Sequence, residues 1–84
     1  MPRFIVVHTA PWTEADLDLK LFQRLPRGFS WKLTYCDFGD KKFFCNWEAP
    51  SKEALENEFK TRNVPFDAVY PVQIFNVSKA KLES

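Results

Sequence analysis

Three side chains in this sequence are of the types that bind soft or borderline metal ions: His8, Cys36 and Cys45. Imidazole nitrogen and thiolate sulfur are donors that nickel, zinc and copper accept in proteins. Their spacing matches no recognised metal motif, because the chain has a single histidine and its two cysteines are nine positions apart. Cysteines of this kind are also found as small buried hydrophobic residues. The three residues are therefore candidate ligands for nickel or zinc, with a structural role as the competing interpretation.

Acid–base chemistry is the second possibility, because His8, Tyr35, Asp37 and Glu48 are side chains that can transfer protons in a pocket. The sequence has no G-x-S-x-G nucleophile motif and no glycine-rich phosphate loop. We therefore assign no catalytic residues and expect a binding protein rather than an enzyme. A cofactor-independent oxygenase or isomerase is the alternative function.

Length and charge restrict the class of protein. The 84 residues predict a single domain, spanning residues 1–84. The formal net charge of +1 argues against strong attraction to nucleic acid or to an anionic membrane. No apolar run is long enough to span a bilayer, and the N-terminus lacks a signal-peptide pattern. We therefore expect a cytoplasmic protein with free thiols.

Hydrophobic periodicity and capping residues predict the elements that hold these side chains. Thr13 and Ser51 are the expected helix N-caps, and Pro71 indicates that the last strand lies at a sheet edge. Residues 78–84 are expected to fray. The predicted elements are a strand at 3–9, a helix at 14–25, a hairpin at 29–49, a helix at 51–62 and a strand at 68–77.

The resulting order, βαββαβ, predicts an α+β fold of the ferredoxin-like sandwich type. Right-handed crossovers place two helices on one face of a four-stranded antiparallel sheet and leave the other face open.

The hairpin has two apolar faces. A turn at residues 40–41 would pair Cys36 with Cys45 and direct both cysteines, with Trp47, towards the helices. The open face would then carry five large apolar side chains: Phe29, Trp31, Leu33, Tyr35 and Phe44.

An apolar face of this size needs a cover. We expect a homodimer in which those five residues form the interface, since two-fold self-association is the commonest assembly. A small-ligand pocket on the same face is also compatible with the pattern, with Trp31, Tyr35 and Phe44 as its contacts.

RNA-recognition motifs share the βαββαβ order and stack bases on aromatic residues of the open sheet. Phe44 occupies a stacking position here, but Lys42 stands where a second ring is needed and the expected glycines are absent. With a near-neutral charge, RNA binding is the third alternative.

The run WKLTYCDFGDKKFFCNWEAPSKEAL (residues 31–55), followed by NVPFDAVYPV (63–72), resembles a family of small uncharacterised bacterial proteins that includes a nickel-binding member. The resemblance implies a ferredoxin-like domain, a dimeric α/β-barrel-like homodimer with packed open sheets, and bound metal in some members. Cys45 matches the third-strand cysteine of this family. Where members carry a second-strand histidine, this chain has Leu33 and so lacks that potential ligand.

Overall fold

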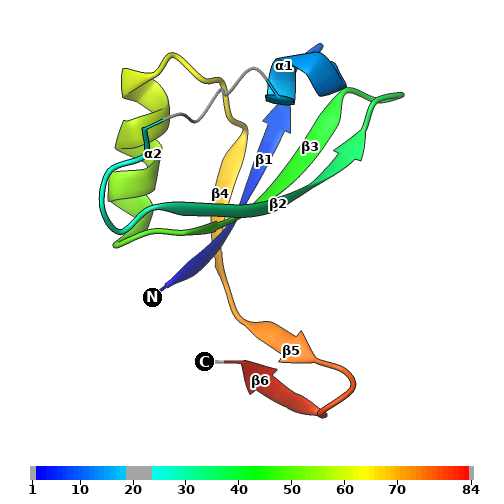
Figure 1. The fold of residues 1–84 in the computed structure, drawn as a ribbon, viewed down its shortest axis with the longest axis vertical. Coiled ribbons are helices and arrows are strands. Elements are labelled where there is room, and N and C mark those ends of the chain that lie inside the picture. Colours follow the sequence, from blue (N-terminus) through cyan, green and yellow to red (C-terminus); the bar gives the residue numbers. More distant parts are fainter. Residues whose placement is uncertain (1, 19–23, 84) are drawn as a thin grey trace.

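A computed structural model describes residues 2–18 and 24–83 of the chain (Figure 1). Four strands form an antiparallel sheet in the order β2-β3-β1-β4, and two further strands pair separately. The predicted α+β class, with a four-stranded antiparallel sheet and two helices, is confirmed. The elements are β1 (Arg3–Thr9), α1 (Glu14–Asp18), β2 (Ser30–Asp37), β3 (Lys42–Glu48), α2 (Lys52–Thr61), β4 (Ala68–Val72), β5 (Ile74–Asn76) and β6 (Lys81–Glu83).

Both predicted helix caps are confirmed. The Thr13 amide donates to the Asp16 carboxylate at 2.8 Å, and the Asp16 amide donates back to the Thr13 hydroxyl at 3.2 Å. The Ser51 hydroxyl likewise accepts a hydrogen bond from the Ala54 amide at 3.1 Å. These side chains satisfy backbone donors that the first helical turn leaves without partners.

The first helix is shorter than predicted. It is described from Glu14 to Asp18, residues 19–23 lie outside the described part, and Arg24 and Leu25 are not helical. Arg24 has a φ of 55°, in the left-handed region that helices do not use. Within the described residues, 2–18 and 24–83, no helix is long and apolar enough to cross a membrane.

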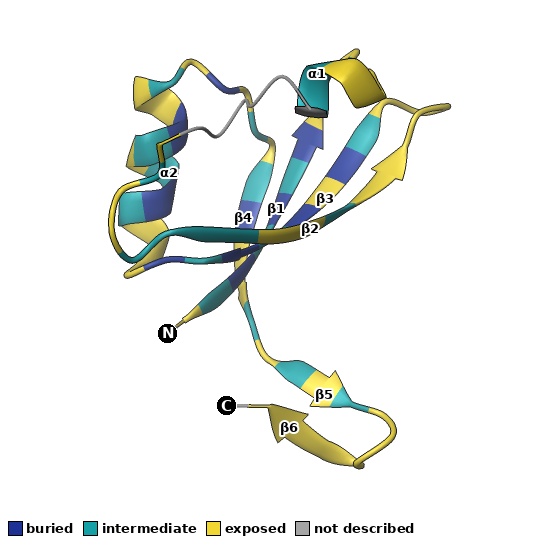
Figure 2. Ribbon diagram, viewed as in Figure 1, coloured by how far each residue is buried: buried dark blue, intermediate teal, exposed yellow. Residues whose placement is uncertain are grey.

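The core lies between the sheet and α2, where the buried residues of Figure 2 gather. Alternate residues of β1 and β3 point into it, as the pleat requires. From α2, Leu55 and Phe59 are fully buried against the sheet. The largest fully buried side chains from the strands are Val6, His8, Phe43, Cys45 and Trp47.

The C-terminal part differs from the prediction in two ways. The single strand expected at 68–77 is broken at Gln73, so β4 joins the sheet and β5 does not. Within the segment expected to fray, Lys81–Glu83 pairs with β5 as β6. The edge position of β4, indicated by Pro71, is confirmed.

The register of the β2–β3 hairpin also differs from the prediction. Cys36 lies opposite Phe43 and Thr34 lies opposite Cys45, so the predicted pairing of the two cysteines is wrong. The shift is by two residues, which leaves every side chain from Leu33 onwards on its predicted face.

An irregularity between Trp31 and Leu33 reverses the faces at the start of β2. Trp31 lies opposite Trp47, and their rings stack with centroids 6.1 Å apart. Phe29 packs against the same helix-side core. The predicted place of Phe29 and Trp31 on the open face is therefore wrong, because one extra residue in a strand turns the preceding side chains to the other side.

Candidate ligand-binding site on the open sheet face

His8 is a core residue. Its side chain is fully buried, its Nδ1 donates to the Pro65 carbonyl oxygen at 2.6 Å, and its ring centroid lies 5.1 Å from that of Trp12 and 5.4 Å from that of Phe59. Because a carbonyl only accepts, the hydrogen must be on Nδ1. Burial lowers the pKa of His8 below its ordinary value of 6.5. The imidazole is therefore neutral at neutral pH.

The two cysteines have different surroundings, and both are free. The Cys45 thiol is buried and accepts a hydrogen bond from the Thr34 hydroxyl at 3.2 Å, which in turn accepts one from Trp31 Nε1 at 2.7 Å. Burial raises the pKa of Cys45 to about 11, so the thiol stays protonated. Cys36 is exposed near the end of β2.

The predicted metal ligands do not form one site. His8 and Cys36 lie on opposite sides of Phe43, each paired with it from a flanking strand. Within residues 2–18 and 24–83, no group of three or more His, Cys, Asp or Glu side chains could hold a metal ion. Metal binding by cysteine also requires a thiolate, which the surroundings of Cys45 disfavour. His8, Cys36 and Cys45 therefore do not fit a shared nickel or zinc centre.

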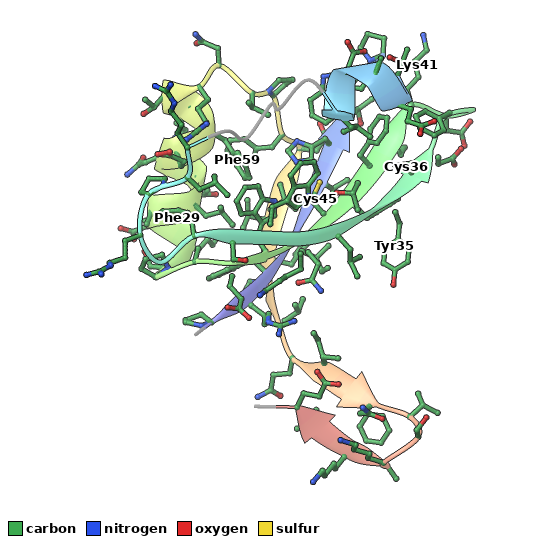
Figure 3. All side chains as sticks on the ribbon, viewed as in Figure 1. Phe29, Tyr35, Cys36, Lys41, Cys45 and Phe59 are labelled. Carbon is green, nitrogen blue, oxygen red and sulfur yellow. The ribbon has the colours of Figure 1, made fainter. Side chains whose placement is uncertain are left out.

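The acid–base combination is not assembled either. Tyr35 projects from the sheet on the side opposite Cys45 and Phe59 (Figure 3), while His8 is buried on the helix side. Asp37 lies at the far end of β2, paired with Lys42. His8 and Tyr35 thus lie on opposite faces of the sheet and cannot act on one substrate together, so these residues do not support the enzyme alternative.

The open face carries exposed apolar side chains. Leu33 is 43% exposed, Tyr35 66%, Phe44 38% and Tyr70 55%. Three of the five side chains predicted for this face are thus on it, and Tyr70 of β4, opposite Ile5, extends the patch.

A groove of about 660 Å³ runs along this face between the sheet and the β5–β6 hairpin. Its apolar lining comes from Ile5, Leu33, Val72 and Ile74. Tyr35 also lines the groove, as expected for a ligand contact. Trp31 and Phe44, the other two predicted ligand contacts, are not among the groove's lining residues.

Polar groups at the groove suit a ligand with a hydrogen-bonding end. Arg3 Nε and Lys32 Nζ lie 3.0 and 3.7 Å from the same oxygen of Glu48, so two cations share one carboxylate. Asn46 Oδ1 is buried, and among the described residues it has no hydrogen-bond donor. A buried acceptor without a donor is costly, so an N–H or O–H donor that reached this oxygen from the groove would stabilise the folded protein.

Some groove residues were predictable and others were not. Strand alternation in RFIVVHT places Ile5 on the face opposite Val6, so its contribution could have been found. The positions of Ile74 and Glu83 were not predictable, because no sequence pattern indicates the separate hairpin that brings them to the groove.

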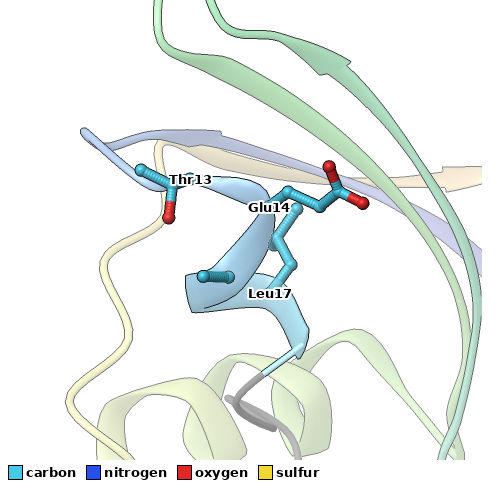
Figure 4. A pocket seen from close by; sticks show the side chains of 4 residues that line it. Thr13, Glu14 and Leu17 are labelled. Carbon is cyan, nitrogen blue, oxygen red and sulfur yellow. The ribbon is translucent and has the colours of Figure 1, made fainter.

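Two other hollows offer less chemistry. One of about 840 Å³ lies beside α1, lined by Thr13, Glu14, Ala15 and Leu17 (Figure 4). Among its described lining residues, Glu14 is the one charged side chain, and no second charged group lies beside it in the lining. A smaller hollow of about 390 Å³ lies by the hairpin turn, with Trp12 in its wall and the His8 ring packed against that indole.

Residues 4–72 match the family model described as nickel responsive protein SCO4226-like. The chain belongs to this family. The expected resemblance to a small bacterial family is thereby confirmed, and the family match ends with β4, before β5 and β6. Among the curated proteins, none matches the chain.

A solved structure of this family, SCO4226 from Streptomyces coelicolor A3(2), superimposes with a TM-score of 0.70. The superposition covers 83% of the present chain and 94% of the SCO4226 chain, and the two sequences are 20% identical. At this identity the likeness shows a common fold.

Proposed function

We propose that this protein is a small homodimeric binding protein with a ferredoxin-like fold, which holds a small ligand in its open-face groove and catalyses no reaction. The observation that carries the proposal is the groove itself, bounded by apolar side chains and by Asn46, whose buried side-chain oxygen has no donor among the described residues. The strand order β2-β3-β1-β4 with helices in both crossovers supports the ferredoxin-like description. With two free cysteines, the protein is assigned to the cytoplasm.

Dimerisation follows from the composition of the open face. Leu33, Tyr35, Phe44 and Tyr70 are exposed on the same face of β2, β3 and β4, and a monomer would leave this apolar surface in water. Packing two such faces together removes this apolar surface from water and gives a closed assembly with two-fold symmetry. RNA stacking is less well supported, because Trp31 packs on Trp47 and is not available to a base.

Ligand binding follows from the size and lining of the groove. Its volume of about 660 Å³ lies within the range of small-molecule sites, roughly 300–1,000 Å³. A second copy over the open face would shield the groove from water and strengthen polar contacts to Asn46 and to the Arg3–Glu48 pair.

The dimer is tested with Tyr35→Asp. A carboxylate buried in the interface without a partner should raise the dimer dissociation constant roughly a hundredfold or more. Sedimentation equilibrium measures the constant.

The ligand is tested separately by native mass spectrometry of wild-type and Asn46→Leu protein. This measurement shows whether a small molecule co-purifies with the protein and whether its binding depends on the groove.

Cys36→Asp is the matched control, because Cys36 is the next residue of β2, is exposed, and lies on the helix side. It should leave the dimer intact. A Tyr35→Asp protein that dimerises as tightly as wild type would sink the proposed interface.

A transition-metal ion, nickel or zinc, is the second candidate ligand, and membership of a nickel responsive family favours it. Of the three predicted ligands, Cys36 is the one that is exposed. We therefore expect nickel bound by untagged protein to be lost in Cys36→Ser and retained in His8→Gln, measured by calorimetry and elemental analysis. Nickel retained by Cys36→Ser, or absent from wild type, would contradict this alternative.

A further inference from the structure

One end of the open-face groove carries an excess of positive charge. Arg3 of β1 lies opposite Glu48 of β3, with Arg3 Nε 3.0 Å from a carboxylate oxygen, and Lys32 Nζ lies 3.7 Å from the same oxygen. Among the described residues, Glu48 is the one acid that forms an ion pair with either cation. Glu83, which also lines the groove, instead accepts a hydrogen bond from Asn76 Nδ2 at 3.1 Å. Two cations therefore share one carboxylate, and one positive charge is left over.

Lys32 reaches this end of the groove because of the irregularity in β2. The register pairs Trp31 with Trp47 and Leu33 with Asn46, and Lys32 is the unpaired residue between them. Lys32 and Leu33 are consecutive, yet both line the groove, which regular strand alternation does not allow. Bulges of this kind are over-represented beside active sites, where they redirect a side chain. Here the extra residue adds a second cation to the groove.

The groove continues from its charged end into an apolar section. Asn46 comes two residues before Glu48 in β3, so its side chain projects from the same face about 7 Å further along the strand. Ile5 and Leu33 lie opposite Asn46 on the two flanking strands, and both line the groove. An elongated ligand would thus meet charge at one end and apolar side chains at the other.

We propose that the groove binds a small organic carboxylate, with its anionic group on Arg3 and Lys32 and its apolar body against Ile5 and Leu33. This inference rests on the proposed function and names the ligand class for that site. The side chains of the two cations are 29% and 41% exposed, so an incoming anion can reach them. A guanidinium has five N–H donors, so Arg3 can hold a second carboxylate besides Glu48. A monoanion balances the single excess charge, whereas a phosphate monoester carries about −1.5 to −2 at pH 7 and would exceed it.

The ligand class is tested by titrating the full-length protein with 3-phenylpropanoate and, separately, with 3-phenylpropanamide. The amide has nearly the same shape as the acid but no charge. We expect the acid to bind about tenfold more tightly or better, because charge-assisted hydrogen bonds are about twice as strong as neutral ones. Calorimetry at pH 7 measures both dissociation constants, and the acid should shift the amide NMR signals of residues 3–5, 32–33 and 46 most.

Lys32→Gln removes one of the two cations. It should raise the dissociation constant of 3-phenylpropanoate about fivefold or more and change that of the neutral amide less than about twofold. Lys60→Gln is the matched control, because Lys60 is exposed in the last turn of α2 and its replacement changes the net charge by the same amount. This control should leave both constants within about twofold of wild type, since exposed charges further apart than about 10 Å are largely screened at 0.1 M salt.

The outcomes separate the ligand class from the proposed function. If the amide binds as tightly as the acid, or if Lys32→Gln and Lys60→Gln weaken the acid equally, the carboxylate inference is wrong and the groove remains the proposed site. If the acid does not bind, or shifts only signals of α2, the inference is likewise wrong. A neutral molecule that co-purifies with wild type and is lost in Asn46→Leu overturns the ligand class while supporting the proposed function.

Discussion

At the scale of single residues, the groups that look most reactive in the sequence are held inactive by the core. His8 donates to the Pro65 carbonyl and packs between Trp12 and Phe59, while Cys45 is buried with a pKa of about 11. Both are therefore neutral groups inside an apolar layer. The polar groups accessible to a ligand lie on the other side of the sheet.

The lowered pKa of His8 makes a prediction about stability and pH. Its unfolded pKa is about 6.5, so below that pH the unfolded chain binds a proton that the folded chain resists. The free energy of unfolding should be constant above about pH 6.5 and fall as pH decreases, by at most about 1.4 kcal/mol per pH unit. Urea unfolding between pH 7.5 and 5.5 measures this slope.

His8→Gln is the control for that measurement. His8 is the only histidine of the chain, so its replacement should flatten the profile in this interval even if overall stability falls. An equal slope in the variant would show that another group is responsible.

At the scale of elements, the sequence predicts the structure where a side chain acts on its own neighbours. The Thr13 and Ser51 caps, the edge position caused by Pro71 and the alternation of β3 are of this kind. The irregularity between Trp31 and Leu33 is not, because no glycine or proline marks it.

That irregularity has a tertiary cause. It lets the Trp31 ring stack on Trp47 of the neighbouring strand, and it lets Trp31 Nε1 donate to the Thr34 hydroxyl, three residues later in the same strand. Side-chain periodicity alone therefore assigned Trp31 and Phe29 to the wrong face. For the same reason, the pattern does not predict that Ile74 and Glu83 line the groove, since both reach it through the break at Gln73.

At the scale of the whole molecule, the chain has a folded unit that ends with β4, followed by the β5–β6 hairpin. This hairpin, residues 74–83, is an arm that adds surface without adding buried core residues. The buried core residues lie between Phe4 and Val69, and the family match ends at residue 72. A sheet covered by helices on one face only is thus combined with an arm that has an uncovered apolar side.

A chain truncated after Val72 tests this division. Because it keeps the complete core, we expect it to fold, with a far-ultraviolet circular dichroism spectrum of mixed α+β type and cooperative thermal unfolding. Both chains should show a Tm that rises with protein concentration, since both keep the open face and assembly stabilises the folded state by mass action. If the truncated chain is unfolded, the arm is part of the fold itself.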